Sequence, residues 1–142
     1  KFGLPFRHVP TYLAGYYKYK AGDQFTEGGK PVNGKRDICD IYAIMYETSE
    51  SVPTLDGTNA FTSPNLISTA RINNAKETNE WTYFKLPFTT LPGKFIDKEK
   101  LMNGKYNIAI VFTSSLEGDH FNGAIGSTLL IDEAELIYHS ED

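Results

Sequence analysis

The stretch Asp37-Ile-Cys-Asp-Ile-Tyr-Ala-Ile-Met-Tyr-Glu47 decides the architecture because both of its faces are apolar. Successive side chains of a strand point to opposite faces, so the residues divide into two alternating sets. The sets are Ile38, Tyr42, Ile44, Tyr46 and Cys39, Ile41, Ala43, Met45. This pattern is typical of a central strand covered on both sides. We therefore expect Cys39 to be a small core side chain rather than a nucleophile.

Further runs rich in aromatic and β-branched residues lie on either side of this stretch. The runs that predict strands are Tyr12–Lys20, Leu66–Ile72, Trp81–Phe88, Lys105–Ser114 and Thr128–Tyr138. Only Asp97–Met102 predicts a helical turn, with Asp97 as its N-cap and Gly104 as its stop. About six strands joined by turn-rich segments, without βαβ spacing, predict an all-β antiparallel sandwich of jelly-roll type.

Length and composition fit a single domain over residues 1–142 and exclude some classes of protein. The chain is 40% hydrophobic and carries a net charge of -4, so no broad cationic field is expected to attract nucleic acid. No apolar run approaches the ~20 residues of a membrane-spanning helix. The chain opens at Lys1 without a targeting pattern, which indicates that such a segment was removed or never included.

Cysteine and histidine usage gives no metal-site motif. Cys39 is the only cysteine and cannot form a disulfide within the chain. The histidines, His8, His120 and His139, are isolated and lack the spacing of a zinc motif. We expect no cofactor, and the one metal considered is a structural Ca²⁺ near the last strand.

Alternation in two strands separates an apolar face from an aromatic and basic face. In Tyr12–Lys20, Leu13, Tyr17 and Tyr19 share one face, and Tyr12, Tyr16, Lys18 and Lys20 share the other. In the second strand, Phe84, Leu86 and Phe88 lie opposite Trp81, Tyr83 and Lys85. Pro87 cannot donate to a ladder, so it places this strand at an edge, at its own end or at a bulge.

These polar aromatic sets are the candidate ligand site. Sugar binding needs flat apolar surfaces for ring C–H groups and polar groups for hydroxyls. Trp81, Tyr83 and Lys85 meet that need, and Tyr16 and Lys18 offer the same chemistry on another strand. Arg71 would add a planar donor group if its strand lies nearby. The alternative is that Trp81 and Tyr83 pack under a loop as a second small cluster.

Catalytic and metal-binding candidates are weaker, and we assign no catalytic residue. Glu117 and Asp119 lie on a glycine-bearing loop where a turn role is expected. The loop serines Ser114, Ser115 and Ser127 lack a nucleophile elbow beside His120, and we expect them to satisfy the loop's own backbone.

Asp132 is the one acidic residue for which a metal is considered. Alternation groups it with Leu130, Ala134 and Leu136 in a set expected to point inward. A buried carboxylate needs a partner, such as Arg36, Arg71, backbone N–H groups or Ca²⁺. A hydrogen-bonded structural role is favoured over a metal ligand.

Several segments in order resemble one family. They are Phe2-Gly-Leu-Pro-Phe6, Gly15-Tyr-Tyr-Lys-Tyr19, Asp40-Ile-Tyr-Ala-Ile-Met-Tyr-Glu47, Trp81-Thr-Tyr-Phe84 and Ser114-Ser115 followed by Gly118-Asp119, Phe121, Gly123-Ala-Ile-Gly-Ser-Thr128 and Ile131-Asp132-Glu133. Together they resemble the putative carbohydrate metabolism domain of Bacteroidetes surface and secreted proteins. The resemblance implies a jelly roll similar to galactose-binding and carbohydrate-binding modules.

The resemblance also implies a function and a location. We expect a noncatalytic carbohydrate-recognition or accessory module of an exported bacterial protein, at the cell surface, in the periplasm or outside the cell. Alternatives are a structural or adhesive domain that binds protein, and a glycoside-active enzyme. The chain resembles the C-terminal part of a longer domain, and missing strands would expose an edge and an apolar face. That exposure predicts association with a preceding domain or another chain.

Overall fold

The computed structural model describes residues 4–50, 54–55, 60–73, 75–116 and 123–139. Within them lie one short helix and strands of very different length. The elements are β1 (Leu4–Pro5), β2 (Val9–Lys20), β3 (Phe25–Glu27), β4 (Lys30–Val32), β5 (Asp40–Glu47), β6 (Leu66–Arg71), β7 (Thr78–Pro87), β8 (Thr89–Thr90), α1 (Lys98–Met102), β9 (Tyr106–Thr113), β10 (Gly123–Ala124) and β11 (Thr128–His139). The six long strands are those that the sequence predicts.

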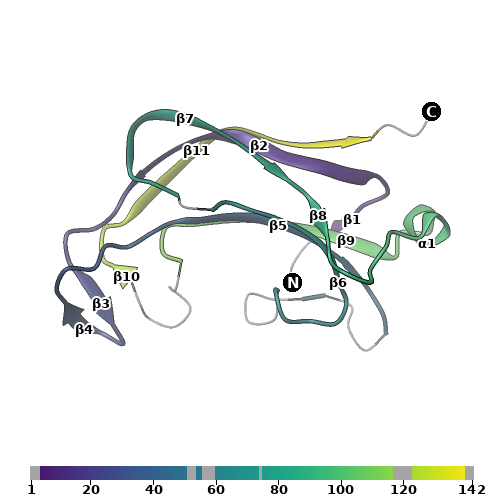
Figure 1. The fold of residues 1–142 in the computed structure, drawn as a ribbon, viewed down its shortest axis with the longest axis horizontal. Coiled ribbons are helices and arrows are strands. Elements are labelled where there is room, and N and C mark those ends of the chain that lie inside the picture. Colours follow the sequence, from purple (N-terminus) through teal and green to yellow (C-terminus); the bar gives the residue numbers. More distant parts are fainter. Residues whose placement is uncertain (1–3, 51–53, 56–59, 74, 117–122, 140–142) are drawn as a thin grey trace.

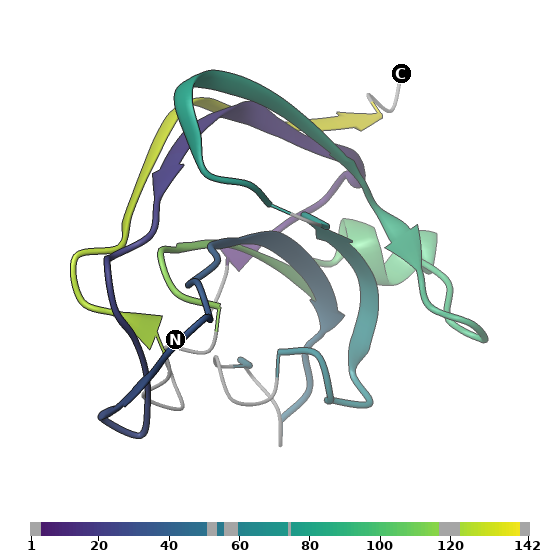
Figure 2. The ribbon, with the colours of Figure 1, turned by 60° about the vertical axis from the view of Figure 1, so that its left-hand side comes forward.

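The strands form two facing sheets and a small third one. A five-stranded sheet has the order β1-β9-β5-β6-β8, and a three-stranded sheet has the order β11-β2-β7. The three-stranded sheet arches over the five-stranded sheet, and the small sheet β10-β3-β4 lies at the end opposite α1 (Figures 1 and 2). Every described strand pair is antiparallel, which confirms the all-β sandwich.

The main core fills the space between the two sheets. Leu13, Tyr17 and Tyr19 of β2 point into it, as alternation predicts. Phe84 and Leu86 of β7 join them from the edge of the same sheet. Contributions from the facing sheet are Cys39, Ile41, Ala43 and Ala70. Cys39 is therefore a core side chain, and burial raises the pKa of its thiol to about 11.

A second cluster lies on the other face of β5, which makes this strand buried on both sides. Tyr42, Ile44 and Tyr46 alternate with the core residues and point away from the facing sheet. They are covered by Leu55, Ala60 and Phe61 from the segment between β5 and β6. The central position predicted for this strand is confirmed, because β5 lies between β9 and β6.

Local signals for the helix and the edge strand are also confirmed. The Asp97 carboxylate caps α1 by accepting the N–H groups of Glu99 and Lys100. Gly104 follows the helix with φ of 69°, a left-handed conformation that suits glycine. Pro87 is the last residue of β7, and β7 is an edge strand.

The inward assignment of Asp132 is wrong because β11 contains a bulge. Leu129 and Ile131 pack against the main core, whereas Leu130 and Asp132 are exposed. The register with β2 shifts between Asp132 and Glu135, and Glu133 has φ of 52°. A bulge inserts one residue and so exchanges the faces of the residues that follow it. Strict alternation along this strand therefore does not predict which side chains point inward on both sides of the bulge.

The β9 edge keeps part of its inner face uncovered. Among the described residues, β1 pairs with β9 through Leu4 with Ile108 and Pro5 with Asn107. Ile110 and Phe112 lie opposite inward-facing residues of β5 in the ladder, yet they are 40% and 37% exposed. Such exposed apolar surface beside an unpaired edge favours association, which stays a prediction.

Membrane insertion through a helix finds no support in the described part of the chain. The helix there, α1, has five residues, and no described helix is long and apolar enough to cross a bilayer.

Candidate functional site

The outer face of the three-stranded sheet collects aromatic side chains from β2 and β7. Tyr16 lies opposite Tyr83 in the ladder, and their ring centroids are 5.2 Å apart. Tyr16 is 36% exposed, Tyr83 is 52% exposed and Trp81 is 44% exposed. The structure thus leaves the predicted aromatic residues open to solvent. The alternative, in which a loop covers Trp81 and Tyr83, is wrong.

Lysine side chains lie against two aromatic rings of the same face. Lys18 Nζ is 4.7 Å from the centroid of a Trp81 ring, and Lys85 Nζ is 4.3 Å from that of Tyr12. An ammonium over an aromatic face is held by the ring quadrupole. We call this surface the aromatic face, and its members are Tyr12, Tyr16, Lys18, Trp81, Tyr83 and Lys85.

A depression of about 340 Å³ adjoins the Trp81 end of the aromatic face. It is bordered by all three strands, since Thr128 lies opposite Lys20 and Leu130 opposite Lys18. We call it the lysine pocket, and its lining residues are Lys18, Tyr19, Lys20, Thr78, Asn79, Thr128 and Leu130. The structure therefore joins an exposed aromatic surface to an open basic pocket.

Arg71 is not part of this surface. It ends β6 in the five-stranded sheet, where its guanidinium forms a bidentate ion pair with Asp40. The Arg71 guanidinium also lies 4.2 Å from the Phe61 ring centroid. The strand does not lie beside Trp81, so the condition for adding Arg71 to the site is not met. Arg71 instead holds the covering segment of the second cluster.

Asp132 lies at the border of the aromatic face rather than in the interior. It is opposite Tyr16 in the ladder, and its Oδ1 accepts the Glu133 N–H at 2.9 Å. Arg36, one partner considered for it, pairs with Glu77 instead. The described residues contain no group of three or more metal-ligating side chains. Glu117, Asp119 and His120 lie outside the described residues, as does the side chain of His139.

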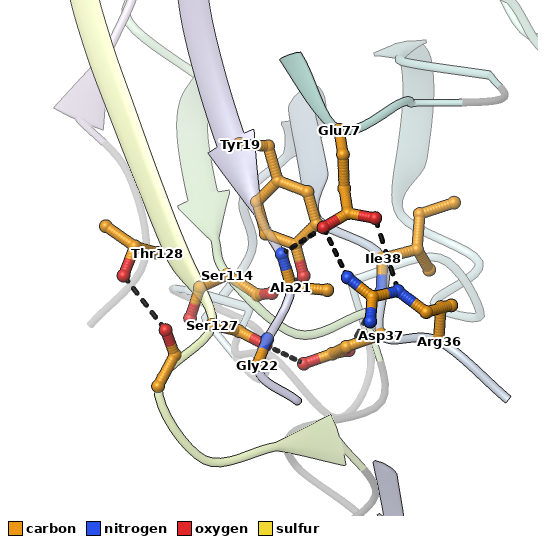
Figure 3. A network of polar contacts seen from close by, with 11 residues as sticks. Tyr19, Ala21, Gly22, Arg36, Asp37, Ile38, Glu77, Ser114, Ser127 and Thr128 are labelled. Carbon is orange, nitrogen blue, oxygen red and sulfur yellow. Dashed lines mark hydrogen bonds and ion pairs between the residues drawn. The ribbon is translucent and has the colours of Figure 1, made fainter. Parts of the chain in front are cut away.

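A buried carboxylate that sequence reasoning missed organises the end of the sandwich beside the lysine pocket. Asp37 Oδ2 accepts hydrogen bonds from Ser115 Oγ at 2.5 Å, Ser127 Oγ at 2.6 Å and the Ala124 N–H at 3.0 Å. Its Oδ1 accepts the Ile38 N–H at 2.9 Å. These bonds tie Asp37 to described residues that follow β9 and precede β11, and the bond from Ser127 is drawn in Figure 3. Ser115 and Ser127 therefore donate to a carboxylate, and not to the backbone of their own loop as predicted; Ser127 Oγ also accepts the Gly22 N–H.

The same network anchors the end of β2, next to Lys20. Tyr19 donates its hydroxyl to the Ser114 carbonyl at 2.6 Å, and burial raises the pKa of Tyr19 to about 12. Glu77 Oε1 accepts the Ala21 N–H, and Glu77 also pairs with Arg36 (Figure 3). The hydrogen bond from Arg36, followed by that from Ala21, holds the pKa of Glu77 below its usual range. One wall of the lysine pocket is thus held in place.

The sequence pattern identifies some residues of the site and not others. Tyr12 and Lys20 share the parity of Tyr16 and Lys18, so alternation alone identifies them. Leu130 carries no such signal because the β11 bulge hides its outward direction. Asp37 sits outside the strands in a polar segment, and nothing local predicts its distant partners Ser115 and Ser127.

The chain is similar to longer proteins of known structure. A crystal structure from Bacteroides thetaiotaomicron VPI-5482, described as a putative glycoside hydrolase, matches with a TM-score of 0.98 and 89% identity, over 99% of this chain and 41% of that chain. A second, from Bacteroides vulgatus ATCC 8482 and described in the same words, matches with a TM-score of 0.91 and 47% identity, over 98% of this chain and 56% of that chain. The chain therefore spans less than two thirds of either protein. No curated protein matches it.

One family model describes nearly the whole chain. The model named putative carbohydrate metabolism domain matches residues 1–137. This match agrees with the resemblance carried by the segments around Gly15, Asp40 and Trp81. The chain belongs to the family of the putative carbohydrate metabolism domain.

Proposed function

We propose that the chain is a noncatalytic module that binds polysaccharide through the aromatic face, within an exported bacterial cell-surface protein. The observation that carries this proposal is the exposure of Tyr16, Trp81 and Tyr83 on one face of two paired strands. The alternating residues of the same strands are buried in the core. Family membership supports carbohydrate as the class of ligand.

The chemistry of the face suits a chain of sugar units. Aromatic rings offer flat apolar surface to the C–H side of a pyranose, and phenol hydroxyls and ammonium groups offer hydrogen bonds at the rim. From Tyr12 to Lys18 the face follows six residue steps of β2, a length of about 20 Å. An open surface of that length fits an extended oligosaccharide better than a single sugar, which is usually enclosed in a deep cavity.

Affinity gel electrophoresis against a panel of bacterial and plant polysaccharides tests the proposal. Wild type is expected to be retarded by at least one polymer, and Trp81→Ala and Tyr83→Ala are each expected to lose most of the retardation. Phe95→Ala is the matched control, because Phe95 is an exposed ring on the segment between β8 and α1. Retention unchanged in both aromatic variants, or no retention by any polymer, contradicts the proposal.

A glycosidase activity is the second candidate, because both similar structures are described as putative glycoside hydrolases. Hydrolysis needs a pair of carboxyl groups about 5 to 9.5 Å apart across the sugar. Of the described carboxylates, Asp37 is engaged by four hydrogen bonds and Asp40 by Arg71. Release of reducing ends from a bound polysaccharide by the purified chain would support this candidate over a noncatalytic role.

A further inference from the structure

The lysine pocket is lined by two ammonium groups, those of Lys18 and Lys20. Lys18 and Lys20 project from the same face of β2, two residues and about 7 Å apart along the strand. Neither forms an ion pair with a carboxylate in the described part of the chain. By contrast, Lys35 pairs with Glu27 and Lys100 pairs with Glu47. The Glu77 carboxylate interacts with Lys20 through space, but its hydrogen bonds go to Arg36 and the Ala21 N–H, so both ammonium groups keep their donors for an anion.

The remaining walls of the pocket offer acceptors for hydroxyl groups. Thr78 donates its hydroxyl proton to the Tyr17 carbonyl, and Thr128 donates its own to the Gly126 carbonyl. Each hydroxyl oxygen then keeps lone pairs that accept a hydrogen bond from a ligand. Leu130 adds apolar surface beside them. The pocket therefore combines cationic donors, neutral acceptors and an apolar patch. A charged sugar has the complementary groups, namely an anion, hydroxyl donors and C–H surface.

The contact between Lys18 and Trp81 favours the binding of anionic ligands over neutral ones. The Lys18 ammonium lies over a Trp81 ring, so a sugar that stacks on this face of the ring must displace it. Displacement by a neutral sugar loses the cation–π attraction without giving the ammonium a new partner. A sugar with a carboxylate or sulfate group replaces that attraction with a charge-assisted hydrogen bond. The arrangement thus favours anionic sugars.

From this geometry we infer that the polysaccharide is anionic, with a carboxylate or sulfate ester of one sugar unit bound between Lys18 and Lys20 while a neighbouring ring stacks on Trp81. This inference rests on the proposed function, because the aromatic face supplies the stacking surface. Carboxylate and sulfate share the chemistry that the two lysines recognise, and the experiment distinguishes them.

Matched polymer pairs test the charge requirement on one sugar backbone. Polygalacturonate is compared with its fully methyl-esterified form, and dextran sulfate with dextran, by isothermal titration in low salt. At least one anionic polymer is expected to bind about tenfold more tightly than its neutral form, the size of two exposed ion pairs. Added NaCl is expected to weaken that binding through screening. The preferred pair identifies the anionic group.

Lysine variants assign the effect to the pocket. Lys18→Gln/Lys20→Gln is expected to remove the preference, and Lys20→Gln alone to reduce it severalfold without touching the Trp81 contact. The control Lys98→Gln/Lys105→Gln removes the same charge in and just after α1, at the opposite end of the sandwich, and is expected to keep the preference (Figure 1).

Three outcomes contradict the inference in distinguishable ways. Equal binding of charged and neutral polymers, unaffected by Lys18→Gln/Lys20→Gln, overturns the inference and leaves the proposed function in place. Binding of anionic polymers that Trp81→Ala does not weaken overturns the inference as well, because the charge effect is then separate from the aromatic face. Absence of binding to every polymer overturns both.

Discussion

The outer faces of the two sheets both carry tyrosines, yet one is covered and the other is open. On the five-stranded sheet, Tyr42 and Tyr46 lie beneath residues of the segment between β5 and β6. On the three-stranded sheet, Tyr16 and Tyr83 face solvent. Each face also has a cation over an aromatic ring, namely Arg71 over Phe61 and Lys18 over Trp81.

This difference teaches that strand sequence alone does not decide whether an aromatic face is core or surface. A tyrosine suits both because its ring is apolar and its hydroxyl is polar. Leu55, Ala60 and Phe61 bury the first face by packing over it. In the described residues, no comparable segment packs over Tyr83.

The largest contrast is expected between Tyr46→Ala and Tyr83→Ala. Tyr46 is fully buried and its hydroxyl accepts a hydrogen bond from Asn107 Nδ2, so its truncation leaves a cavity and a buried amide without its partner. We expect Tyr46→Ala to lower the free energy of unfolding by about 3–5 kcal/mol. Tyr83→Ala is expected to cost less than about 1 kcal/mol. Urea unfolding measures both, and similar costs would contradict the comparison.

The interior between the sheets is expected to make stability fall at alkaline pH. The pKa of Cys39 is about 11 in the folded chain against 9.0 for an unperturbed thiol, so the unfolded chain loses its thiol proton first. Its contribution is fully present below pH 9 and is lost as the pH rises to about 11, a loss of about 2–3 kcal/mol.

Cys39→Ala isolates this contribution, because the alkaline titration of Tyr19, whose pKa is also raised, remains. Urea unfolding is measured at several pH values between 8 and 11. The free energy of unfolding is expected to fall less steeply with pH in the variant than in wild type. The two slopes are expected to differ by at most about 1.4 kcal/mol per pH unit. A thiol reagent that labels native Cys39 as fast as the unfolded chain would show that the thiol is not shielded.

Removing the cover of the second cluster is expected to have an intermediate effect. Phe61 is half-buried, and its ring lies 4.8 Å from that of Tyr42 with Arg71 on another side. We expect Phe61→Ala to cost about 2 kcal/mol, roughly half the value for a fully buried ring, and to expose Tyr42. Tyrosine quenching by a neutral solute is the readout. Unchanged quenching would mean that Phe61 does not cover the face.

The smallest effect is expected at the border of the open face. Asp132 lies near the lysine pocket on β11, so its charge opposes an anionic ligand. Asp132→Asn keeps an Oδ1 acceptor for the Glu133 N–H and removes the charge. We expect about a twofold to threefold gain in affinity for the anionic polymer that wild type prefers, measured by titration. A loss of affinity would contradict this expectation and would show that the Asp132 carboxylate itself takes part in binding.

Much of the fold and the aromatic face were predictable because they follow short-range rules. Alternation placed Tyr16 and Trp81 outward, and capping placed α1 after Asp97. The β11 bulge was not predictable, since both alternating sets of that strand contain apolar residues. The hydrogen bonds of Asp37 and the position of Arg71 depend on pairing between distant segments, which no local pattern encodes.

Trp81 is the only tryptophan of the chain, so its fluorescence reports directly on the aromatic face. The most direct test is acrylamide quenching of this residue with and without a polysaccharide that retards the chain in gels. Ready quenching is expected in the free protein, because Trp81 is exposed, and clear protection is expected when the polysaccharide is present. An indole that is shielded in the free protein, or one that stays equally accessible at saturating polysaccharide, would contradict the account.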